Sequence, residues 1–173
     1  MTPRRLARIA PVAVAVAILV SGCGGGSNPE LKGTNGSAIA AAANVTVPPT
    51  VLGLTLSSEN VAQTVASTPR TYVDSLVLYG LRQDNLLEAT FQVARFNPGN
   101  VYTRQQFRLE MVDQIGSALP VTLDVAGTTV YLTEGNRQRI YVWFANRFFF
   151  VLACRQDYQT PRSLLRQLLM VQT

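Results

Sequence analysis

Residues 138–154 read QRIYVWFANRFFFVLAC, and they set the centre of the expected sheet. Large apolar side chains occupy both alternating sets of positions over residues 138–144 and again over residues 148–154. A strand with one face in water alternates apolar and polar residues, whereas a strand covered on both faces is apolar throughout. The break at 145–147 (Ala-Asn-Arg) is compatible with a turn. We therefore predict two strands in the middle of a sheet.

Four further strands are expected around this pair. Residues 119–125 and 128–133 precede it, with turn-compatible breaks at 126–127 and 134–136. Residues 72–82 and 86–96 alternate in polarity and are separated by Gln-Asp-Asn, which indicates a hairpin. One face of this hairpin is expected to contact water, because one alternating set is apolar and the other is polar. The apolar set is Leu87, Ala89, Phe91 and Val93, and the polar set is Glu88, Thr90 and Gln92.

A helix is predicted between the two groups of strands. Thr103 and Gln106 have the spacing of a capping box, and Tyr102 before the cap can pack on Phe107 as a hydrophobic staple. The helix is therefore expected to start at Arg104. Its buried stripe is expected to consist of three residues spaced every four positions, and Gly116 suits a left-handed helix end. The stripe residues are Phe107, Met111 and Ile115.

Two other helices complete the predicted domain. Thr160 followed by Pro161 opens a final helix with leucines 164, 165, 168 and 169 on one face. Ser57 or Ser58 can cap a short helix over residues 59–67. The order is helix, two strands, helix, four strands, helix. We predict a single α+β domain over residues 51–173, with a mainly antiparallel sheet of about six strands and the helices packed on one face.

The N-terminus has the pattern of an export signal. Arg4, Arg5 and Arg8 precede a mostly apolar run over residues 9–20, and small residues follow it. A membrane-spanning helix needs roughly 20 apolar residues, and this run is shorter and contains Pro11. A signal peptide over residues 1–22 is therefore favoured over a permanent transmembrane helix. An uncleaved hydrophobic N-terminus is the alternative.

The end of this run, Val20-Ser21-Gly22-Cys23, resembles the lipobox of bacterial lipoproteins. In that family the cysteine thiol is diacylated and the leader is removed just before it, so the resemblance implies that Cys23 becomes a diacylglyceryl cysteine. Two acyl chains suffice for stable anchoring. The resemblance covers the first 23 residues, and it implies export and a lipid anchor at the outer face of the bacterial cell membrane. The general secretory route is preferred to a twin-arginine route, because residues 6–8 fit the latter pattern poorly.

Residues 23–50 are predicted to combine the lipidated cysteine with a flexible tether, since their glycine-rich and polar composition buries little apolar surface. The leader holds three of the fifteen basic residues and none of the ten acidic ones, which leaves residues 23–173 a formal charge of +2. This charge gives no support for nucleic-acid binding. With Cys23 acylated, Cys154 remains unpaired, so no intrachain disulfide is expected and a small buried thiol is the favoured role.

Residues for catalysis are nearly absent. The chain has no histidine, which excludes Ser-His-Asp and Cys-His catalysis and the usual zinc sites. Glu110 and Asp113 lie three apart on the predicted helix, a spacing that lets two carboxylates share a face. A solvated helix surface is the favoured interpretation of that pair. We therefore expect no enzymatic activity, no metal and no cofactor.

Two groups of residues are candidates for binding. Tyr141 and Trp143 share one face of a strand, and an aromatic pair left partly exposed suits a partner or a lipid-like ligand; the alternative is that both rings are core. Four arginines flank the central strands and suit lipid headgroups or anionic wall polymer, although ordinary solubilising charge is the favoured interpretation. They are Arg137, Arg139, Arg147 and Arg155.

Three functional hypotheses follow from these features. The preferred one is a non-catalytic envelope module that binds an unknown protein or wall polymer. The others are a carrier or sensor of lipid-like ligands, and an envelope hydrolase. Beyond the membrane contact made by the lipid anchor, the sequence identifies no partner.

Overall fold

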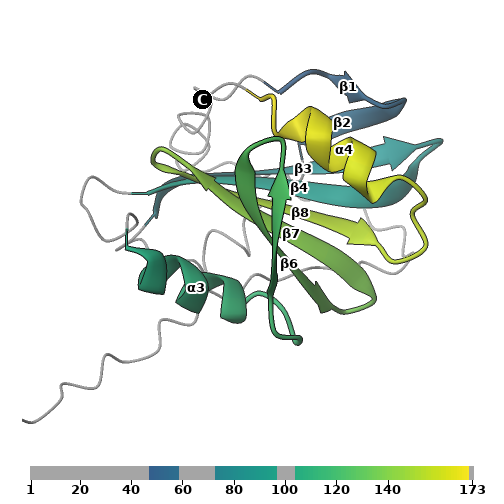
Figure 1. The fold of residues 1–173 in the computed structure, drawn as a ribbon. Helices are drawn as coiled ribbons and strands as arrows, with labels where there is room; N and C mark the ends of the chain where they lie inside the picture. The colour runs from purple at the N-terminus through teal and green to yellow at the C-terminus, as the bar shows by residue number, and fades with distance from the viewer. Residues whose placement is uncertain (1–46, 59–72, 97–103, 172–173) are drawn as a thin grey trace, which may run out of the picture.

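The computed structural model describes residues 47–58, 73–96 and 104–171. In these residues eight strands form one antiparallel sheet with the order β1-β2-β3-β4-β8-β7-β6-β5 (Figure 1). Two short helices accompany it, α3 (Gln105–Asp113) and α4 (Pro161–Leu168). The strands are β1 (Thr50–Val51), β2 (Leu54–Ser58), β3 (Val73–Gln83), β4 (Leu86–Phe96), β5 (Val121–Val125), β6 (Thr128–Gly135), β7 (Gln138–Ala145) and β8 (Phe148–Arg155).

The six predicted strands are all present, with bounds shifted by a few residues, and β8 and β7 lie in the interior of the sheet as expected. The predicted count of six is too low, because β1 and β2 add an edge hairpin. Leu52 and Gly53 form its turn with φ values of 50° and 77°. Ser57 and Ser58, predicted as helix caps, are instead the last residues of β2. The helix predicted over residues 59–67 lies outside the described residues. The described part is thus mostly sheet, and the α+β prediction is matched only roughly.

Tight turns hold consecutive strands in register. Asp84-Asn85, Ala126-Gly127 and Asn136-Arg137 each place two successive residues at positive φ. Two-residue turns of this kind match the right-handed twist of the strands that they connect. In the β7–β8 hairpin the resulting register places Trp143 opposite Phe150. The hairpin signals in the sequence therefore correspond to real turns.

The two helices pack on opposite faces of the sheet, so the prediction that the helices share one face is wrong (Figure 1). One face buries Phe150, Leu152 and Cys154 of β8 with the leucines of α4. The other face buries Phe149, Val151 and Ala153 with Met111 and Val112 of α3. The physical reason is the two-sided apolarity of β7 and β8, because each apolar face needs its own cover. Below, these are called the α4 face and the α3 face.

An aromatic stack fills the centre of the α4 face. Phe91, Trp143 and Phe150 come from the neighbouring strands β4, β7 and β8. The Trp143 and Phe150 rings are 5.1 Å apart with an interplanar angle of 6°, and Phe91 lies 5.8 Å from Trp143. Parallel rings at these spacings pack closely and exclude water. The stack forms the floor on which α4 lies.

Helix α3 begins one residue later than predicted, with Arg104 as its N-cap and no side-chain capping bond. Thr103 and Tyr102, which carry the predicted capping box and staple, lie outside the described residues. The predicted stripe is largely confirmed: Met111 and Ile115 are buried and Phe107 is half-buried, while Val112 adds a fully buried contact.

Gly116 does not have the predicted left-handed conformation, since its φ is not positive. It lies against Thr133 of β6, and a side chain at this position would overlap the Thr133 side chain. The Thr133 hydroxyl donates to the carbonyl of Ala118 over 2.7 Å, and the Ser117 amide donates to the carbonyl of Glu134 over 2.9 Å. Glycine is therefore needed here for close packing between the α3–β5 connection and β6.

Candidate functional site: a groove beside helix α4

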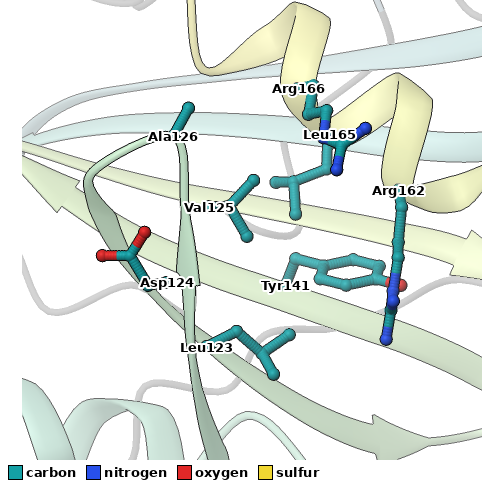
Figure 2. Close-up of a pocket in the computed structure, with 8 residues that line it drawn as sticks. All are labelled: Leu123, Asp124, Val125, Ala126, Tyr141, Arg162, Leu165 and Arg166. Atoms are coloured by element: carbon teal, nitrogen blue, oxygen red, sulfur yellow. The ribbon is translucent and has the colours of Figure 1, made fainter.

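Two adjoining pockets lie between α4 and the β5–β7 part of the sheet, and they share Tyr141 and Arg162. The smaller, of about 200 Å³, is lined mainly by the β5–β6 hairpin and α4 (Figure 2). The larger, of about 380 Å³, is lined by β6, β7 and the first turn of α4. Because two residues belong to both pockets, we treat them as one groove, here called the α4 groove.

The β5–β6 hairpin forms one wall of the α4 groove. Leu123 and Val125 of β5 line the smaller pocket opposite Leu165 of α4 (Figure 2). The turn after β5 is held by Asp124, whose carboxylate accepts a hydrogen bond from the Gly127 amide over 3.2 Å. In Figure 2 this carboxylate is turned away from Tyr141 and Arg162. The smaller pocket thus has apolar walls and an acidic group directed outward.

Tyr141 joins the groove to the core. Its side chain is only 2% exposed, and its ring packs with the cluster beneath α4. The hydroxyl end of the ring points toward Arg162 (Figure 2), and it forms no hydrogen bond with any described residue. Burial raises the pKa of Tyr141, and the nearby Cys154 thiol raises it further, while Arg139 and Arg162 lower it. Among the described residues the fully buried side-chain polar atom without a hydrogen-bond partner is Gln138 Oε1, so the Tyr141 hydroxyl opens onto the groove and is available to a ligand there.

Positive charge surrounds this hydroxyl. Arg139 of β7 and Arg162 of α4 line the larger pocket, and Arg166 lines the smaller one. None of these three guanidinium groups forms an ion pair with a carboxylate in the part of the chain that the structure describes. Arg155 is different, because it lies 2.6 Å from Asp157 and 3.8 Å from Glu88. Within the described residues, the cations of the groove therefore lack the carboxylate partners that Arg155 has.

The N-terminus of α4 adds to this positive charge. Thr160 is the N-cap but makes no side-chain capping bond, and no acidic residue occupies the first turn. Thr160, Pro161 and Ser163 line the larger pocket together with Arg162. A helix N-terminus carries a partial positive charge, and an arginine placed there is unfavourable unless an anion lies nearby. The groove consequently combines a helix end, guanidinium groups and the hydroxyl of Tyr141.

The aromatic pair predicted as a possible ligand or partner face does not form an exposed surface. Tyr141 is 2% exposed and Trp143 is 3% exposed, because α4 and the β5–β6 hairpin cover that face of β7. Trp143 is stacked between core rings and lines neither pocket. The structure therefore places Trp143 in the core, as the alternative interpretation had it, and brings only Tyr141 to the groove.

The structure separates the four predicted arginines. Arg139 lies in the α4 groove, and Arg155 is paired with acidic side chains. Arg147 donates two hydrogen bonds to the carbonyl of Phe96, the shorter being 2.6 Å, and so joins the β7–β8 turn to the end of β4. Arg137 lies exposed in the β6–β7 turn. Sequence reasoning missed Arg162 and Arg166, although their spacing of four residues on a helix indicates a shared face.

The remaining candidates fit structural roles. Glu110 and Asp113 are exposed, neither lines the α4 groove, and Glu110 accepts a hydrogen bond from Gln106 over 3.0 Å. Cys154 is fully buried, and its burial raises the pKa of the thiol to about 12. A thiol with this pKa stays protonated at neutral pH and is a poor nucleophile.

The comparisons with known proteins assign no relative. No family model, curated protein or solved structure matches the chain. Among the described residues no cluster of three or more histidine, cysteine, aspartate or glutamate side chains has the arrangement to hold a metal ion. Within residues 47–58, 73–96 and 104–171, neither helix has the length and apolarity to cross a membrane.

Proposed function

We propose that this chain is a lipoprotein of the bacterial cell envelope, anchored through Cys23 to the outer face of the membrane, whose domain binds a ligand without catalysing a reaction. The lipobox-like segment and its leader support the anchor. The observation that carries the binding proposal is the hydroxyl of Tyr141, which opens onto the α4 groove beside guanidinium groups and has no partner among the described residues.

The chemistry of the groove favours binding over catalysis. Arginine, tyrosine, threonine and leucine side chains are suited to holding a ligand. General acid–base catalysis at neutral pH needs a group that titrates near neutrality, whereas the pKa of Tyr141 is raised above that of an ordinary phenol. A non-catalytic role is the simplest function for such a set of side chains.

The size of the groove favours a small ligand, and so supports the carrier or sensor hypothesis within the class of binding proteins. Its larger pocket has a volume of about 380 Å³, which lies in the range typical of small-molecule sites. A stable protein interface commonly buries about 800 Å² on each partner.

A protein or wall-polymer partner is the second candidate, and a different surface supports it. Leu119 is 86% exposed and Val121 is 57% exposed at the β5 edge of the sheet. Exposed apolar side chains next to an edge strand favour contact with another chain. This candidate requires no ligand in the α4 groove.

The anchor is tested by comparing the wild-type chain with Cys23→Ser in cell fractions. The wild-type protein is expected in the membrane fraction, with a diacylglyceryl group on an N-terminal Cys23 by mass spectrometry. The Cys23→Ser chain is expected to stay unprocessed or to be released. A mature wild-type chain that starts at another residue, or that keeps its leader, would refute the anchor.

The ligand hypothesis is tested by purifying the chain from its native host and extracting bound small molecules. A stoichiometric amphiphile, absent from a parallel preparation of Tyr141→Phe, would support a carrier or sensor. A co-purifying protein that is lost in Val121→Asp but kept in Tyr141→Phe would support the second candidate and contradict the first.

A further inference from the structure

We infer that the α4 groove binds an oxyanion that carries a short apolar group, with the anion at Tyr141, Arg139, Arg162 and the first turn of α4, and the apolar group between Leu123, Val125 and Leu165. This inference rests on the proposed binding function and specifies its ligand class. A carboxylate and a phosphate ester share the required chemistry.

The anionic end of the ligand is inferred from hydrogen-bond donors of the groove that have no partner among the described residues. The Tyr141 hydroxyl opens onto the groove and has no partner among the described residues, and a phenol donates a strong hydrogen bond to an ionised acceptor. Arg139 and Arg162 line the same pocket as Tyr141, and the hydroxyl points toward Arg162 (Figure 2). One oxyanion at this point would satisfy the hydroxyl and neutralise the two guanidinium groups.

The first turn of α4 supplies additional donors. The side chain of Thr160, the N-cap residue, makes no hydrogen bond to the backbone amides of the first turn. Arg162 lies in that turn. Thr160 and Ser163 line the same pocket, and the hydroxyl groups of these residue types can donate to an anion. An anion at this helix end interacts favourably with the helix dipole and offsets the unfavourable position of Arg162.

The apolar end of the ligand is inferred from the walls of the smaller pocket. Leu123 and Val125 on the hairpin and Leu165 on α4 form its walls, and Tyr141 connects it to the anionic end (Figure 2). Its volume of about 200 Å³ suits a short chain or one apolar side chain. The Arg166 stem adds apolar contact while its charge reaches solvent.

Two carboxylates limit the charge of the ligand. Asp124 lines the smaller pocket but is turned outward and bound to the Gly127 amide (Figure 2). Glu134 lines the larger pocket and pairs with Arg139 across the β6–β7 ladder, yet their side chains form no ion pair. A polyanion would meet the exposed Glu134 carboxylate, so a single oxyanionic group fits best.

Calorimetric titration of the full chain in lipid nanodiscs tests the ligand class, with empty nanodiscs as the blank. Hexyl phosphate and hexanoate are expected to bind at one site. Hexanol, which lacks the anion, and inorganic phosphate, which lacks the chain, are each expected to bind at least about tenfold more weakly. Equal binding of hexanol and hexyl phosphate, or no binding of either anionic probe, would overturn the inference.

Matched variants locate the site. Tyr141→Phe removes only the hydroxyl and is expected to weaken hexyl phosphate binding by about tenfold, whereas Tyr79→Phe, a half-buried tyrosine outside the groove, should have no effect. Arg162→Gln should weaken binding to a similar extent, and Arg104→Gln at the N-cap of α3 should not. Unchanged affinity in both Tyr141→Phe and Arg162→Gln would contradict the assignment.

A short-chain phospholipid distinguishes the source of the oxyanion. Dihexanoyl phosphatidylglycerol that binds more tightly than hexyl phosphate would assign the site to a lipid headgroup. Weaker binding of this phospholipid, with hexanoate retained, would assign a free amphiphilic acid. If membrane fractionation confirms the Cys23 anchor and none of these probes binds, the ligand class is wrong and the proposed anchored lipoprotein stands.

Discussion

The two faces of the sheet place their hydroxyl groups differently. On the α3 face the Thr133 hydroxyl lies within the packing and donates to the carbonyl of Ala118 over 2.7 Å. On the α4 face the Tyr141 ring is buried, but its hydroxyl opens onto the groove and has no partner among the described residues. The Thr133 hydroxyl therefore contributes to the fold, whereas the Tyr141 hydroxyl is available to the ligand that we propose for the α4 groove.

The helices that cover the two faces also differ in how deeply their apolar side chains are buried. Leu164, Leu165 and Leu168 of α4 are each at most 1% exposed, and they lie against the Phe91–Trp143–Phe150 stack. On α3 the outer end of the stripe is Phe107, which is only half-buried. Truncations on the α4 face are therefore expected to cost more stability than those under α3.

The largest effect is expected for Trp143→Ala on the α4 face. Removal of a fully buried, stacked ring should lower the free energy of unfolding by about 3 to 5 kcal/mol in denaturant melts of the full chain. Val121→Ala, at an exposed position of β5, should change it by less than about 0.5 kcal/mol. A Trp143→Ala chain with wild-type stability would show that the aromatic stack is not core.

A smaller loss is expected for Phe107→Ala on the α3 face. Phe107 contacts Phe96 edge to face at 5.9 Å but remains half-buried, so about 2 kcal/mol should be lost. The same melts measure both variants. A loss equal to that of Trp143→Ala would contradict the difference between the two faces.

Alkaline pH should weaken the α4 face. Burial in the folded chain raises the pKa of the Cys154 thiol from 9.0 to about 12. The stability that comes from keeping this thiol protonated is therefore fully present below pH 9 and is lost as pH rises toward 12. The slope is at most about 1.4 kcal/mol per pH unit for one group. Tyr79 and Tyr141 also have raised pKa values and act in the same direction above pH 10. Cys154→Ala should flatten the decline between pH 9 and 10, and an unchanged profile in this variant would exclude the thiol as its cause.

The smallest effect is expected for the Tyr141 hydroxyl. Tyr141→Phe should change the free energy of unfolding of the unliganded chain by less than about 0.5 kcal/mol, because this hydroxyl opens onto the groove and has no partner among the described residues. Thr133→Val on the α3 face, where the hydroxyl has a partner, should instead be destabilising since it leaves the carbonyl of Ala118 unpaired. Thermal melts without ligand measure both. Destabilisation by Tyr141→Phe would show that the hydroxyl has a structural partner.

Much of this fold follows from local sequence patterns. The two-sided apolarity of residues 138–154 predicted the interior strands β7 and β8, and turn signals predicted the hairpins. The short hairpin β1–β2 was missed because its strands are brief and its serines also suit a helix cap. Assigning each helix to a face was not possible, because a strand that is apolar on both sides accepts either helix on either face.

The α4 groove was only partly predictable. Tyr141 and Arg139 were recognised as candidates from their place on the central strands. Arg162 and Arg166 were missed because an exposed arginine on an amphipathic helix looks like ordinary surface charge. Only the position of α4 over this face of the sheet brings Arg162 beside the Tyr141 ring, and the two residues are far apart in the sequence (Figure 2).

The most direct test of the functional difference between the two faces is an amide chemical-shift titration of the isotopically labelled full chain with hexyl phosphate. Saturable shifts are expected at Tyr141, Arg162 and Ser163 around the α4 groove, and none at Met111 and Val112 under α3. Shifts confined to the α3 face, or no saturable shift at Arg162 and Ser163, would contradict this difference.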